Sequence, residues 1–443
     1  MRRIAATLSV MLCLALGNSE TRAEDWPQWM GPERNGVYEE DGLIRSIPES
    51  GLRKLWSTPI AAGYAGPAVA GDRVFVTDYV TTSGKSTNNP GKRDAMNGKE
   101  RVLCLDEKTG KEIWKFEYER PYSLSYANGP RATPTVDGDR VYVLGAEGDL
   151  LCLQVASGDV VWRKQLAETY DTESPIWGYS AHPLIYGDMV ITLAGGKGSA
   201  VVALDKMTGA ELWKSLTTAD IGYCPPTVYE LGGKPRLVIW HSDSINCLEL
   251  SDGSVYWTYK LKPRYGMSIA APQLLGNRLF ACGIGETSAM LELDAEGKPG
   301  ESLWDGTPKT GIYSGNATAL FTEDAIYGAD CGSGKFIAVN PDDGSRFWES
   351  FALTGGGERR ISHGTSFVVL NEDVYFIFAE TGDLILAKLS TTGFSELGRT
   401  RLLEPTGECF GREVVWSHPA FANRCVFARN DKEIVCYSLA AEE

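Results

Sequence analysis

Short runs of alternating apolar and polar residues, separated by glycine-rich turns, occupy most of the chain. Residues 132–166 show the pattern best, with strand-like runs at 132–136, 140–144, 150–154 and 160–166. Turns such as Asp137-Gly138-Asp139 and Ser157-Gly158 separate these runs. Alternation with a period of two is typical of β-strands, and turns this short join antiparallel neighbours. The pattern therefore predicts one four-stranded antiparallel sheet in this part of the chain.

A second, longer period is superimposed on the strand pattern. A turn glycine is followed four residues later by a large apolar residue at Gly110/Trp114, Gly158/Trp162, Gly209/Trp213, Gly253/Trp257, Gly300/Trp304, Gly344/Trp348 and, in degenerate form, Gly393/Leu397. Trp56 occupies the same position, five residues after Gly51. Successive tryptophans stand 44 to 58 residues apart, which is the spacing of β-propeller blades. We expect these tryptophans to be structural residues that dock one blade on the next, because each would bury a large apolar surface.

The number of periods predicts an all-β fold, an eight-bladed β-propeller of four-stranded antiparallel blades. Seven full periods cover 64–399, and a three-strand stretch over 401–439 lacks its tryptophan strand. The strand around Trp56 lacks the other three. Pairing of this N-terminal strand with the C-terminal blade would close the ring and leave no unpaired edge at the junction. We therefore expect the propeller to span 52–440, after an N-terminal arm over 24–51.

Residues 1–23 have the features of a secretory signal peptide. Two arginines precede an apolar run over 4–16, and a polar stretch ends at Ala23. The run is too short to span a bilayer, so we expect its removal, with Glu24 as the first residue of the processed chain and Gly17 as the alternative cleavage site. No later stretch is apolar enough to cross a membrane. We expect an exported, soluble protein, periplasmic or extracellular.

The charge balance excludes one class of partner. The chain carries a formal net charge of −15 at pH 7. Binding to nucleic acid requires a basic face, so we expect no nucleic-acid partner.

The ten cysteines of the chain do not form an obvious disulfide framework. Cys104, Cys152, Cys247 and Cys436 occupy one equivalent position in the third strand of different blades, where other blades have alanine. A position that accepts alanine or cysteine is a small buried one, and equivalent positions on separate blades are too far apart to bridge. We expect these four to be free thiols. Pairing remains open for a second set, Cys224, Cys282, Cys331, Cys409 and Cys425.

The repeat resembles that of the pyrroloquinoline-quinone (PQQ) repeat propellers. The family signature is an alanine, an aspartate, a Thr-Gly turn and the docking tryptophan, and it stands here over Ala203 to Trp213. The resemblance covers nearly the whole processed chain and is greatest to secreted bacterial propellers. More remotely, the chain is similar to the propeller lipoprotein of the outer-membrane barrel-assembly machinery. At the Thr-Gly turns we expect Asp106, Asp205 and Asn340 to bond the turn backbone.

The resemblance also raises the question of a cofactor. Some members are dehydrogenases that hold PQQ and calcium in the axial funnel and carry an adjacent cysteine pair, which this chain lacks. The loops that would supply oxygen ligands to calcium offer Glu147, Asp243, Glu286 and Asp330, in no recognisable quinone motif. No Gly-x-Ser-x-Gly, His-Glu-x-x-His or Cys-x-x-Cys motif occurs. We expect a non-catalytic protein without cofactor or metal, and keep a PQQ-dependent dehydrogenase with calcium as the alternative.

One face of the predicted propeller collects the unusual side chains. The loops that enter the innermost strands and the loops between the second and third strands open on the same face, and all four histidines fall on or beside it. The candidate residues of this ligand face are Tyr64, Arg131, Tyr179, His182, Tyr223, Trp240, His241, Ser314, His363, Trp416 and His418. We expect them in solvated loops around the axial funnel, beside a mobile rim loop within 78–101. His182 and His363 lie on opposite blades, so these two are not expected to share a metal ion. His363 and His418 lie on neighbouring blades and remain possible as a pair, although we expect each to be a loop histidine with its hydrogen bonds satisfied.

Aromatic rings and hydrogen-bonding groups around a concavity are the usual composition of a binding site. The sequence therefore predicts a protein-interaction scaffold or a ligand-binding module in the cell envelope, acting as a monomer. The partner would be an envelope protein or a small polar or saccharide ligand, and the sequence does not choose between them.

Overall fold

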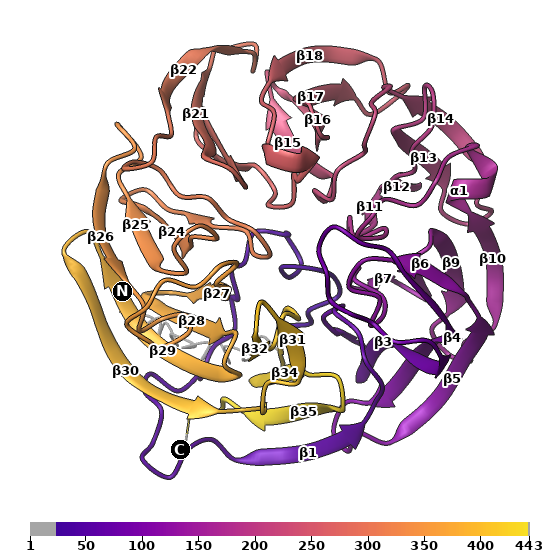
Figure 1. Cartoon of the computed structure of the whole chain (residues 1–443), viewed down its shortest axis with the longest axis horizontal. Helices are drawn as coiled ribbons and strands as arrows, with labels where there is room; N and C mark the ends of the chain where they lie inside the picture. The colour runs from indigo at the N-terminus through magenta and orange to yellow at the C-terminus, as the bar shows by residue number, and fades with distance from the viewer. Residues whose placement is uncertain (1–23, 442–443) are drawn as a thin grey trace, which may run out of the picture.

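A computed structural model describes residues 24–441. The predicted signal peptide, 1–23, lies outside the described residues. Within them the chain forms eight blades, each built on four strands, arranged radially around one axis, as Figure 1 shows. Helix is limited to α1 (Leu166–Thr169) and the short 3-10 turn η1 (Arg264–Gly266). The predicted all-β, eight-bladed propeller of four-stranded antiparallel blades is confirmed.

The first four blades contain strands β2 to β18. Blade 1 comprises β2 (Ala68–Ala70), β3 (Arg73–Ser83), β4 (Asp94–Asp106) and β5 (Glu112–Glu119), with β6 (Tyr122–Leu124) added to β4. Blade 2 comprises β7 (Thr135–Asp137), β8 (Arg140–Leu144), β9 (Asp149–Gln154) and β10 (Val160–Gln165). Blade 3 comprises β11 (Leu184–Tyr186), β12 (Met189–Leu193), β13 (Val201–Asp205) and β14 (Glu211–Ser215). Blade 4 comprises β15 (Thr227–Leu231), β16 (Lys234–Trp240), β17 (Ser244–Glu249) and β18 (Val255–Lys260).

The remaining blades complete the ring. Blade 5 comprises β19 (Gln273–Leu275), β20 (Arg278–Gly283), β21 (Thr287–Leu293) and β22 (Pro299–Asp305). Blade 6 comprises β23 (Leu320–Phe321), β24 (Ile326–Ala329), β25 (Phe336–Val339) and β26 (Arg346–Ser350). Blade 7 comprises β27 (Ser366–Asn371), β28 (Val374–Ala379), β29 (Asp383–Ser390) and β30 (Gly393–Arg401). Blade 8 comprises β33 (Ala420–Ala422), β34 (Cys425–Arg429), β35 (Glu433–Ser438) and β1 (Lys54–Pro59), and a separate hairpin, β31 (Gly407–Cys409) and β32 (Arg412–Val414), precedes it.

Ring closure joins the two ends of the fold. Strand β1 pairs antiparallel with β35, with Trp56 opposite Cys436 and Pro59 opposite Glu433. The N-terminal strand thus supplies the outermost strand of blade 8, as the sequence predicts. Residues far apart in sequence therefore hold the disk shut, and no blade is left without its fourth strand.

Each docking tryptophan makes the same contact with the following blade. The indole Nε1 of Trp56 donates to the carbonyl of Glu107 at 2.7 Å, and Trp114 donates to Val155 at 2.9 Å. The same bond to the next blade recurs at Trp162, Trp213, Trp257, Trp304 and Trp348. The indole ring fills the space between two blades, and its N–H is hydrogen-bonded to the next blade. Tryptophan is therefore buried there without an unpaired donor.

The turn glycine of the repeat is required by the same interface. Gly110 has φ +68°, and a Cβ built there would lie 2.5 Å from the ring of Trp56. Gly158 faces Trp114 in the same way. Glycine is therefore needed both for the left-handed backbone and for the approach of the indole.

The cysteine position lies directly opposite the docking tryptophan. Cys104 pairs with Trp114, and Cys152 pairs with Trp162, across antiparallel strands. All nine cysteines within 24–441 are free, and all but Cys425 are buried. The prediction of free thiols at Cys104, Cys152, Cys247 and Cys436 agrees with this. The five cysteines whose pairing the sequence leaves open are also free thiols.

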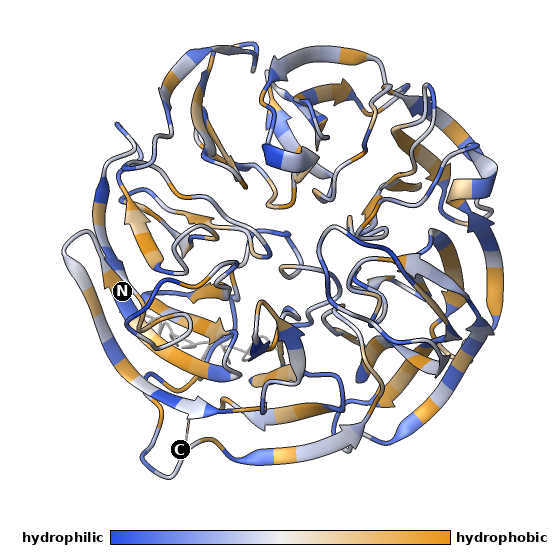
Figure 2. Ribbon diagram, in the orientation of Figure 1, coloured by the Kyte–Doolittle hydropathy of each residue, from blue (hydrophilic) through white to orange (hydrophobic). Residues whose placement is uncertain are grey.

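Hydropathy follows the depth of each strand in the blade. The third strand β9 is buried over most of its length, whereas the outermost strand β10 exposes several of its side chains. In Figure 2 the outer strands carry interspersed blue and orange segments, which is the pattern of a half-solvated sheet.

The N-terminal arm, residues 24–51, crosses one end of the ring, and Figure 1 shows it as the indigo trace behind the centre. It forms isolated bridges from Trp26 to Val69 in blade 1 and from Val37 to Leu370 in blade 7. Between these two points its Pro27 carbonyl accepts a bond from Val136 in blade 2. The arm therefore contacts blades on both sides of the axis before entering β1.

Candidate functional site

A cavity of about 650 Å³ lies on the propeller axis, and we call it the axial cavity. Loops from most blades contribute to its wall, because the innermost strands converge there. Of the predicted ligand-face residues, those in the wall are Tyr64, Arg131, His182, Tyr223, His363, Trp416 and His418. Sequence reasoning placed these residues on one face, and the structure brings them around one space.

Four predicted residues lie outside the wall. Trp240 is fully buried, and its Nε1 donates to the carbonyl of Leu261 at 3.0 Å, so it belongs to the core of blade 4. Tyr179 is buried with its hydroxyl bonded to the Ala194 carbonyl at 2.8 Å. His241 and Ser314 are likewise buried away from the cavity. The register of a loop residue relative to the axis depends on the loop path, which strand periodicity does not specify.

The expectation of solvated loops is wrong for the base of the cavity. The indole of Trp29, from the N-terminal arm, stacks on His182 with ring centroids 5.0 Å apart and planes 11° from parallel. Its Nε1 donates to Nε2 of His418 at 3.3 Å. The guanidinium carbon of Arg34 lies over the same indole, 5.3 Å from the ring centroid, and Arg34 donates to the carbonyls of His182 and Pro183. The arm thus closes one end of the axis, and the cavity has a floor.

Both floor histidines are neutral at pH 7. Burial, with smaller effects from His418 and Arg34, lowers the pKa of His182 well below its usual range. Burial lowers the pKa of His418 to about 3. Nδ1 of His182 accepts the backbone N–H of Thr133 at 2.8 Å, which a protonated ring could not do.

The two floor histidines come from blades that are not adjacent, yet their rings are in contact near the axis. The rings of His182 in blade 3 and His418 in blade 8 have centroids 6.0 Å apart. The sequence singles out only His363 and His418 as neighbours, because their blades are adjacent. Close to the axis, however, residues from distant blades converge on one point.

Arg131 is the cation of the cavity wall. Its guanidinium donates to the carbonyls of Gly129, Ser125 and Tyr126 and lies 5.3 Å from the ring centroid of Tyr64. Within the described residues it forms no ion pair with a carboxylate. Among the described residues that line the cavity there is no aspartate or glutamate, although the chain has 58 such residues. The wall therefore offers a guanidinium that no described carboxylate contacts as an ion pair.

Tyr223 presents a polar group that the protein leaves unused. The residue is 4% exposed and lines the cavity, yet its hydroxyl makes no well-formed hydrogen bond within the described part of the chain. Its ring packs edge-on against Trp177, with centroids 5.5 Å apart. Burial, reinforced by Asp220, raises the pKa of Tyr223 above its usual range, so the hydroxyl is a proton donor. An unsatisfied buried hydroxyl costs about 1–3 kcal/mol, which a ligand acceptor would remove.

The opposite wall is aromatic and ordered by polar contacts at its edge. His363 stacks on Phe410 with centroids 4.9 Å apart and planes 7° from parallel, and its Nδ1 lies 3.3 Å from Sγ of Cys331. Nε1 of Trp416 donates to the buried carboxylate of Glu380 at 3.4 Å. These contacts fix the ring orientations without filling the cavity.

Several wall residues hold a left-handed backbone that side chains rarely adopt. The φ angles are +51° at Tyr126, +59° at Tyr265, +56° at His363 and +46° at Phe410, and all four residues line the cavity. Strain of this kind costs about 1–3 kcal/mol per residue and concentrates at functional sites. A glycine follows Tyr265, His363 and Phe410 in the sequence and indicates a turn at each place. It does not indicate that the residue before the glycine also holds a positive φ.

Two insertions reach the mouth of the cavity. The segment expected to be a mobile rim loop is largely a long hairpin of β3 and β4, and only its tip, 84–93, is irregular. At that tip Pro90 and Gly91 join the cavity wall. Nδ2 of Asn88 donates to the carbonyl of Glu408 in the β31–β32 hairpin at 2.7 Å. The two insertions therefore touch each other beside the opening.

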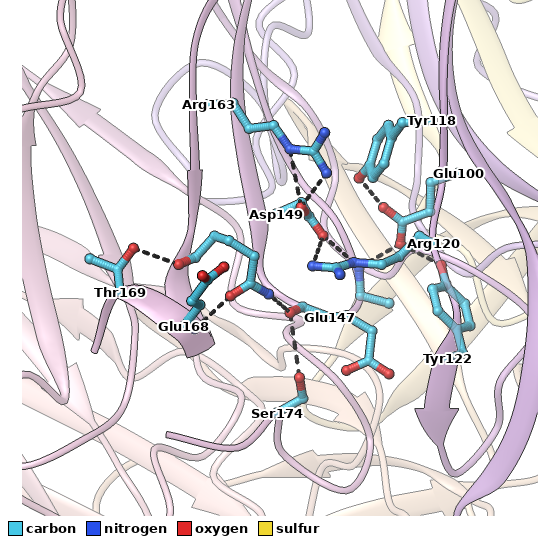
Figure 3. A network of polar contacts seen from close by, with 12 residues as sticks. Glu100, Tyr118, Arg120, Tyr122, Glu147, Asp149, Arg163, Glu168, Thr169 and Ser174 are labelled. Atoms are coloured by element: carbon cyan, nitrogen blue, oxygen red, sulfur yellow. Dashed lines mark hydrogen bonds and ion pairs between the residues drawn. The ribbon is translucent and has the colours of Figure 1, made fainter. Parts of the chain in front are cut away.

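A second polar cluster lies beside the cavity but serves the fold. In Figure 3 the carboxylate of Glu100 accepts hydrogen bonds from the hydroxyls of Tyr118 and Tyr122. The carboxylate of Asp149 forms ion pairs with Arg120 and Arg163. Burial raises the pKa of Glu100. Both carboxylates are satisfied by the donors around them, so the cluster ties the loops of blades 1 and 2 together.

The residues present do not fit a calcium ion. Calcium takes six to eight oxygen ligands, mostly carboxylates and carbonyls, whereas the cavity wall has no carboxylate. The four acids considered from the sequence do not line the cavity. Glu147 accepts a hydrogen bond from the N–H of Ser123, and Asp330 accepts one from the N–H of Ser333. Asp243 forms an ion pair with Lys262, and Glu286 lies outside the wall. Among the described residues, no group of three or more His, Cys, Asp or Glu side chains is placed to hold a metal.

Neither helix in the described part of the chain is long and apolar enough to cross a membrane.

One protein family matches most of the chain. Residues 98–223 and 197–441 match the PQQ_2 family, described as outer membrane protein assembly factor BamB.

Individual relatives are distant and only partly covered. A 163-residue stretch, 35% of this chain, is 26% identical to 21% of the quinohemoprotein alcohol dehydrogenase ADH IIB of Pseudomonas putida. A 183-residue stretch, 40% of this chain, is 24% identical to 43% of outer membrane protein assembly factor BamB of Burkholderia pseudomallei. The matched stretches thus span less than half the length of either relative.

Solved structures share the architecture. BamB from Moraxella catarrhalis superposes with a TM-score of 0.56 at 16% identity, over 88% of this chain and 99% of that one. Quinohemoprotein alcohol dehydrogenase from Comamonas testosteroni superposes with a TM-score of 0.58 at 14% identity, over 96% of this chain and 82% of that one. At these identities the likeness shows the fold alone.

Proposed function

Because this chain belongs to the PQQ_2 family, whose description is outer membrane protein assembly factor BamB, we propose that it is an exported, non-catalytic propeller that binds a ligand in its axial cavity. The observation that carries the proposal is the cavity itself. Its floor and walls are aromatic, its Arg131 has no carboxylate partner among the described residues, and its Tyr223 hydroxyl has no acceptor. A folded protein leaves such groups unmatched where a ligand completes them.

The chemistry of the wall selects an organic anion with a flat, apolar body. Rings such as Trp177 and Trp416 offer faces for stacking, and Arg131 offers the charge. The absence of acidic residues from the wall removes the repulsion that an anion would otherwise meet. At about 650 Å³ the cavity lies within the range of about 300–1,000 Å³ that is usual for small-molecule sites.

A quinone-dependent dehydrogenase is the alternative, and one relative is named a quinohemoprotein alcohol dehydrogenase. PQQ is itself flat and carboxylated, so its binding would fall within the proposed ligand class. The donor set among the described residues does not fit the calcium ion of those enzymes. Turnover of an alcohol with an artificial electron acceptor, in the presence of PQQ and calcium, would support the alternative against the binding protein.

A protein partner at the cavity mouth is the second candidate. Tyr265 is 67% exposed and Phe410 is 48% exposed, and both line the opening. Exposed aromatic residues at the edge of a concavity are typical of protein interfaces. The family description names an assembly factor, which suits a partner in the envelope.

A titration with chemically matched probes tests the proposal. Tryptophan fluorescence is recorded with 2-naphthoate, neutral 2-naphthylmethanol and cationic 2-naphthylmethylammonium, since Trp29, Trp177 and Trp416 line the cavity. We expect the anion to bind about tenfold or more tightly than the neutral probe, as charge-assisted hydrogen bonds contribute about 1.5–3 kcal/mol. Lys108→Ala, an exposed change on the opposite face, is the control and should not alter this order. Equal binding of the three probes would contradict the proposed ligand class.

A further inference from the structure

Thr365 joins two side chains of the axial cavity wall, His363 and Asn316. Its hydroxyl donates to the carbonyl of His363 at 3.0 Å, and Nδ2 of Asn316 donates to that hydroxyl at 3.2 Å. A hydroxyl has one proton, and because Thr365 donates it to His363, the contact with Asn316 has to be donated by the amide nitrogen. The carbonyl oxygen Oδ1 of Asn316 is therefore left as an acceptor, and among the described residues no donor binds it.

The thiol of Cys331 sets which nitrogen of His363 carries the ring proton. Its Sγ lies 3.3 Å from Nδ1 of His363. Burial, reinforced by Asp330, raises the pKa of Cys331 to about 12, whereas burial, with a smaller effect from Arg412, lowers the pKa of His363. At pH 7 the thiol is therefore protonated and the imidazole is neutral. Nδ1 is the acceptor that the described residues offer to this thiol, so Nδ1 is unprotonated and Nε2 carries the proton.

Nε2–H of His363 is left without a partner in the described part of the chain. His363 lines the axial cavity and Cys331 does not, so the Nδ1 edge of the ring is turned toward the protein. Phe410 stacks on the ring with centroids 4.9 Å apart, which holds this orientation. The donor Nε2–H of His363 and the acceptor Oδ1 of Asn316 thus lie on neighbouring side chains, and we call them the polar pair.

The polar pair lies across the axis from Arg131. Arg131 precedes β7 in blade 2 and Asn316 precedes β23 in blade 6, and these blades are opposite each other in the ring of eight (Figure 1). An aromatic wall connects the two ends. Tyr126, whose carbonyl accepts a bond from Arg131, has its ring centroid 6.1 Å from that of Trp416, and the Trp416 centroid is 6.3 Å from that of His363. A flat ring system stacked on this wall therefore runs from the guanidinium toward the polar pair.

We propose that the ligand is an aromatic hydroxy acid, whose carboxylate binds Arg131 and whose hydroxyl, at the far end of its ring system, binds the polar pair. The hydroxyl accepts Nε2–H of His363 and donates its own proton to Oδ1 of Asn316. A carboxylate at this place has no proton for Oδ1, and an ammonium has no lone pair for Nε2–H, so the pair selects a neutral group that both donates and accepts. Cys331 is a positioning residue, since it acts through the tautomer of His363.

Isomeric probes test the position of the hydroxyl on the unaltered protein. Binding is measured by isothermal titration calorimetry at pH 7 with 2-naphthoate, 6-hydroxy-2-naphthoate and 3-hydroxy-2-naphthoate. The two hydroxy acids have the same composition and charge, but only the 6-hydroxyl lies at the end remote from the carboxylate. We expect the 6-hydroxy acid to bind about fivefold or more tightly than 2-naphthoate, the size of one net hydrogen bond, and the 3-hydroxy acid to show no gain. An equal gain from both isomers, or none from the 6-hydroxy acid, would overturn the inference.

The inference rests on the proposed function, and the same titrations separate the two. Loss of the preference for 2-naphthoate over neutral 2-naphthylmethanol contradicts the anion site at Arg131, and with it the acid half of this ligand class. A preserved preference for the anion, without a gain from the 6-hydroxyl, overturns the polar pair and leaves the proposed function standing.

Asn316→Ala removes the acceptor of the polar pair. The 6-hydroxyl gain should fall to about twofold or less, because one of the two hydrogen bonds is lost, while 2-naphthoate binds as it does to the wild type. Asn277→Ala makes the same truncation in the turn between β19 and β20, on the opposite face of the disk, and should leave the gain unchanged. A full gain in Asn316→Ala would place the hydroxyl elsewhere and overturn the inference.

The tautomer of His363 is measured without any ligand, by nitrogen-15 NMR at pH 7. We expect an unprotonated Nδ1 and a protonated Nε2. Cys331→Ser keeps a hydrogen-bond donor at the same position and should preserve both this pattern and the 6-hydroxyl gain. Cys331→Ala removes the donor, so we expect a mixture of tautomers and a smaller gain. A proton on Nδ1 in the wild-type protein would overturn the proposal, and an unchanged tautomer in Cys331→Ala would overturn the role of Cys331.

Discussion

The indole of Trp29 lies flat on the imidazole of His182, with ring centroids 5.0 Å apart, although one residue comes from the N-terminal arm and the other from the entrance to blade 3. The contact turns an open axial channel into a cavity with a floor. The arm that closes the ring at β1 therefore also shapes the proposed binding site. Stability and binding should respond together when this contact is broken.

Replacing Trp29 by alanine tests that coupling. Trp29 is 2% exposed, so its loss should lower the free energy of unfolding by about 3–5 kcal/mol and remove the floor of the cavity. Urea denaturation and naphthoate binding are measured on the same preparation. Tyr265→Ala, at an exposed wall residue, is the control and should leave the urea midpoint nearly unchanged. A Trp29→Ala protein with normal binding would show that the arm has no part in the site.

The floor histidines should make the protein sensitive to acid. Their folded pKa values lie below the unfolded value of about 6.5, so unfolding takes up protons once the pH falls below that value. Stability is full above pH 6.5 and declines as the pH falls toward 3, by up to about 1.4 kcal/mol per pH unit for each histidine.

The measurement is the free energy of unfolding between pH 7.5 and pH 4. His418→Gln keeps a polar side chain but cannot titrate, so its curve should be flatter than that of the wild type over this range. Parallel curves would show that His418 is not the group responsible.

The interface glycine offers a test of the blade contact. Gly110→Ala places a methyl group 2.5 Å from the Trp56 ring at φ +68°, and should cost about 1–3 kcal/mol from overpacking in addition to backbone strain. Gly138→Ala is matched in backbone, with φ +57°, but meets nothing within 4 Å. It should cost only the strain, about 1 kcal/mol. Thermal denaturation that finds equal losses at the two sites would contradict the docking role.

A tyrosine pair separates a binding residue from a structural one. The Tyr223 hydroxyl donates no hydrogen bond to the described residues, so Tyr223→Phe should leave stability unchanged or raise it while weakening naphthoate binding. The Tyr179 hydroxyl bonds the Ala194 carbonyl, so Tyr179→Phe should lose about 1 kcal/mol of stability without an effect on binding. Reversed outcomes would place the ligand away from Tyr223.

The sequence carries the architecture because the repeat is periodic. Tryptophan and glycine at fixed spacing specify the blade interface, and in most blades a cysteine or alanine opposite the tryptophan specifies its partner strand. One N-terminal strand and one incomplete C-terminal blade then specify how the ring closes. These signals are local, and each blade repeats them.

The site is less accessible to sequence reasoning because it is assembled across blades. Arg131 and His182 could be assigned to the correct face from strand order, yet the meeting of His182 and His418 depends on convergence at the axis. Trp29 lies in a segment without repeat signal, so its position under the funnel could not be derived. Trp240 is expected in a loop but is core, because it is the last residue of strand β16 and pairs with Ile245 of β17.

The most direct test is a crystal structure of the protein with bound 2-naphthoate. The account expects density for the naphthalene ring inside the axial cavity, with the carboxylate within hydrogen-bonding distance of Arg131 and an oxygen accepting the Tyr223 hydroxyl. An axial cavity that stays empty at a concentration that saturates the fluorescence signal, or naphthoate bound only at another surface, would contradict it.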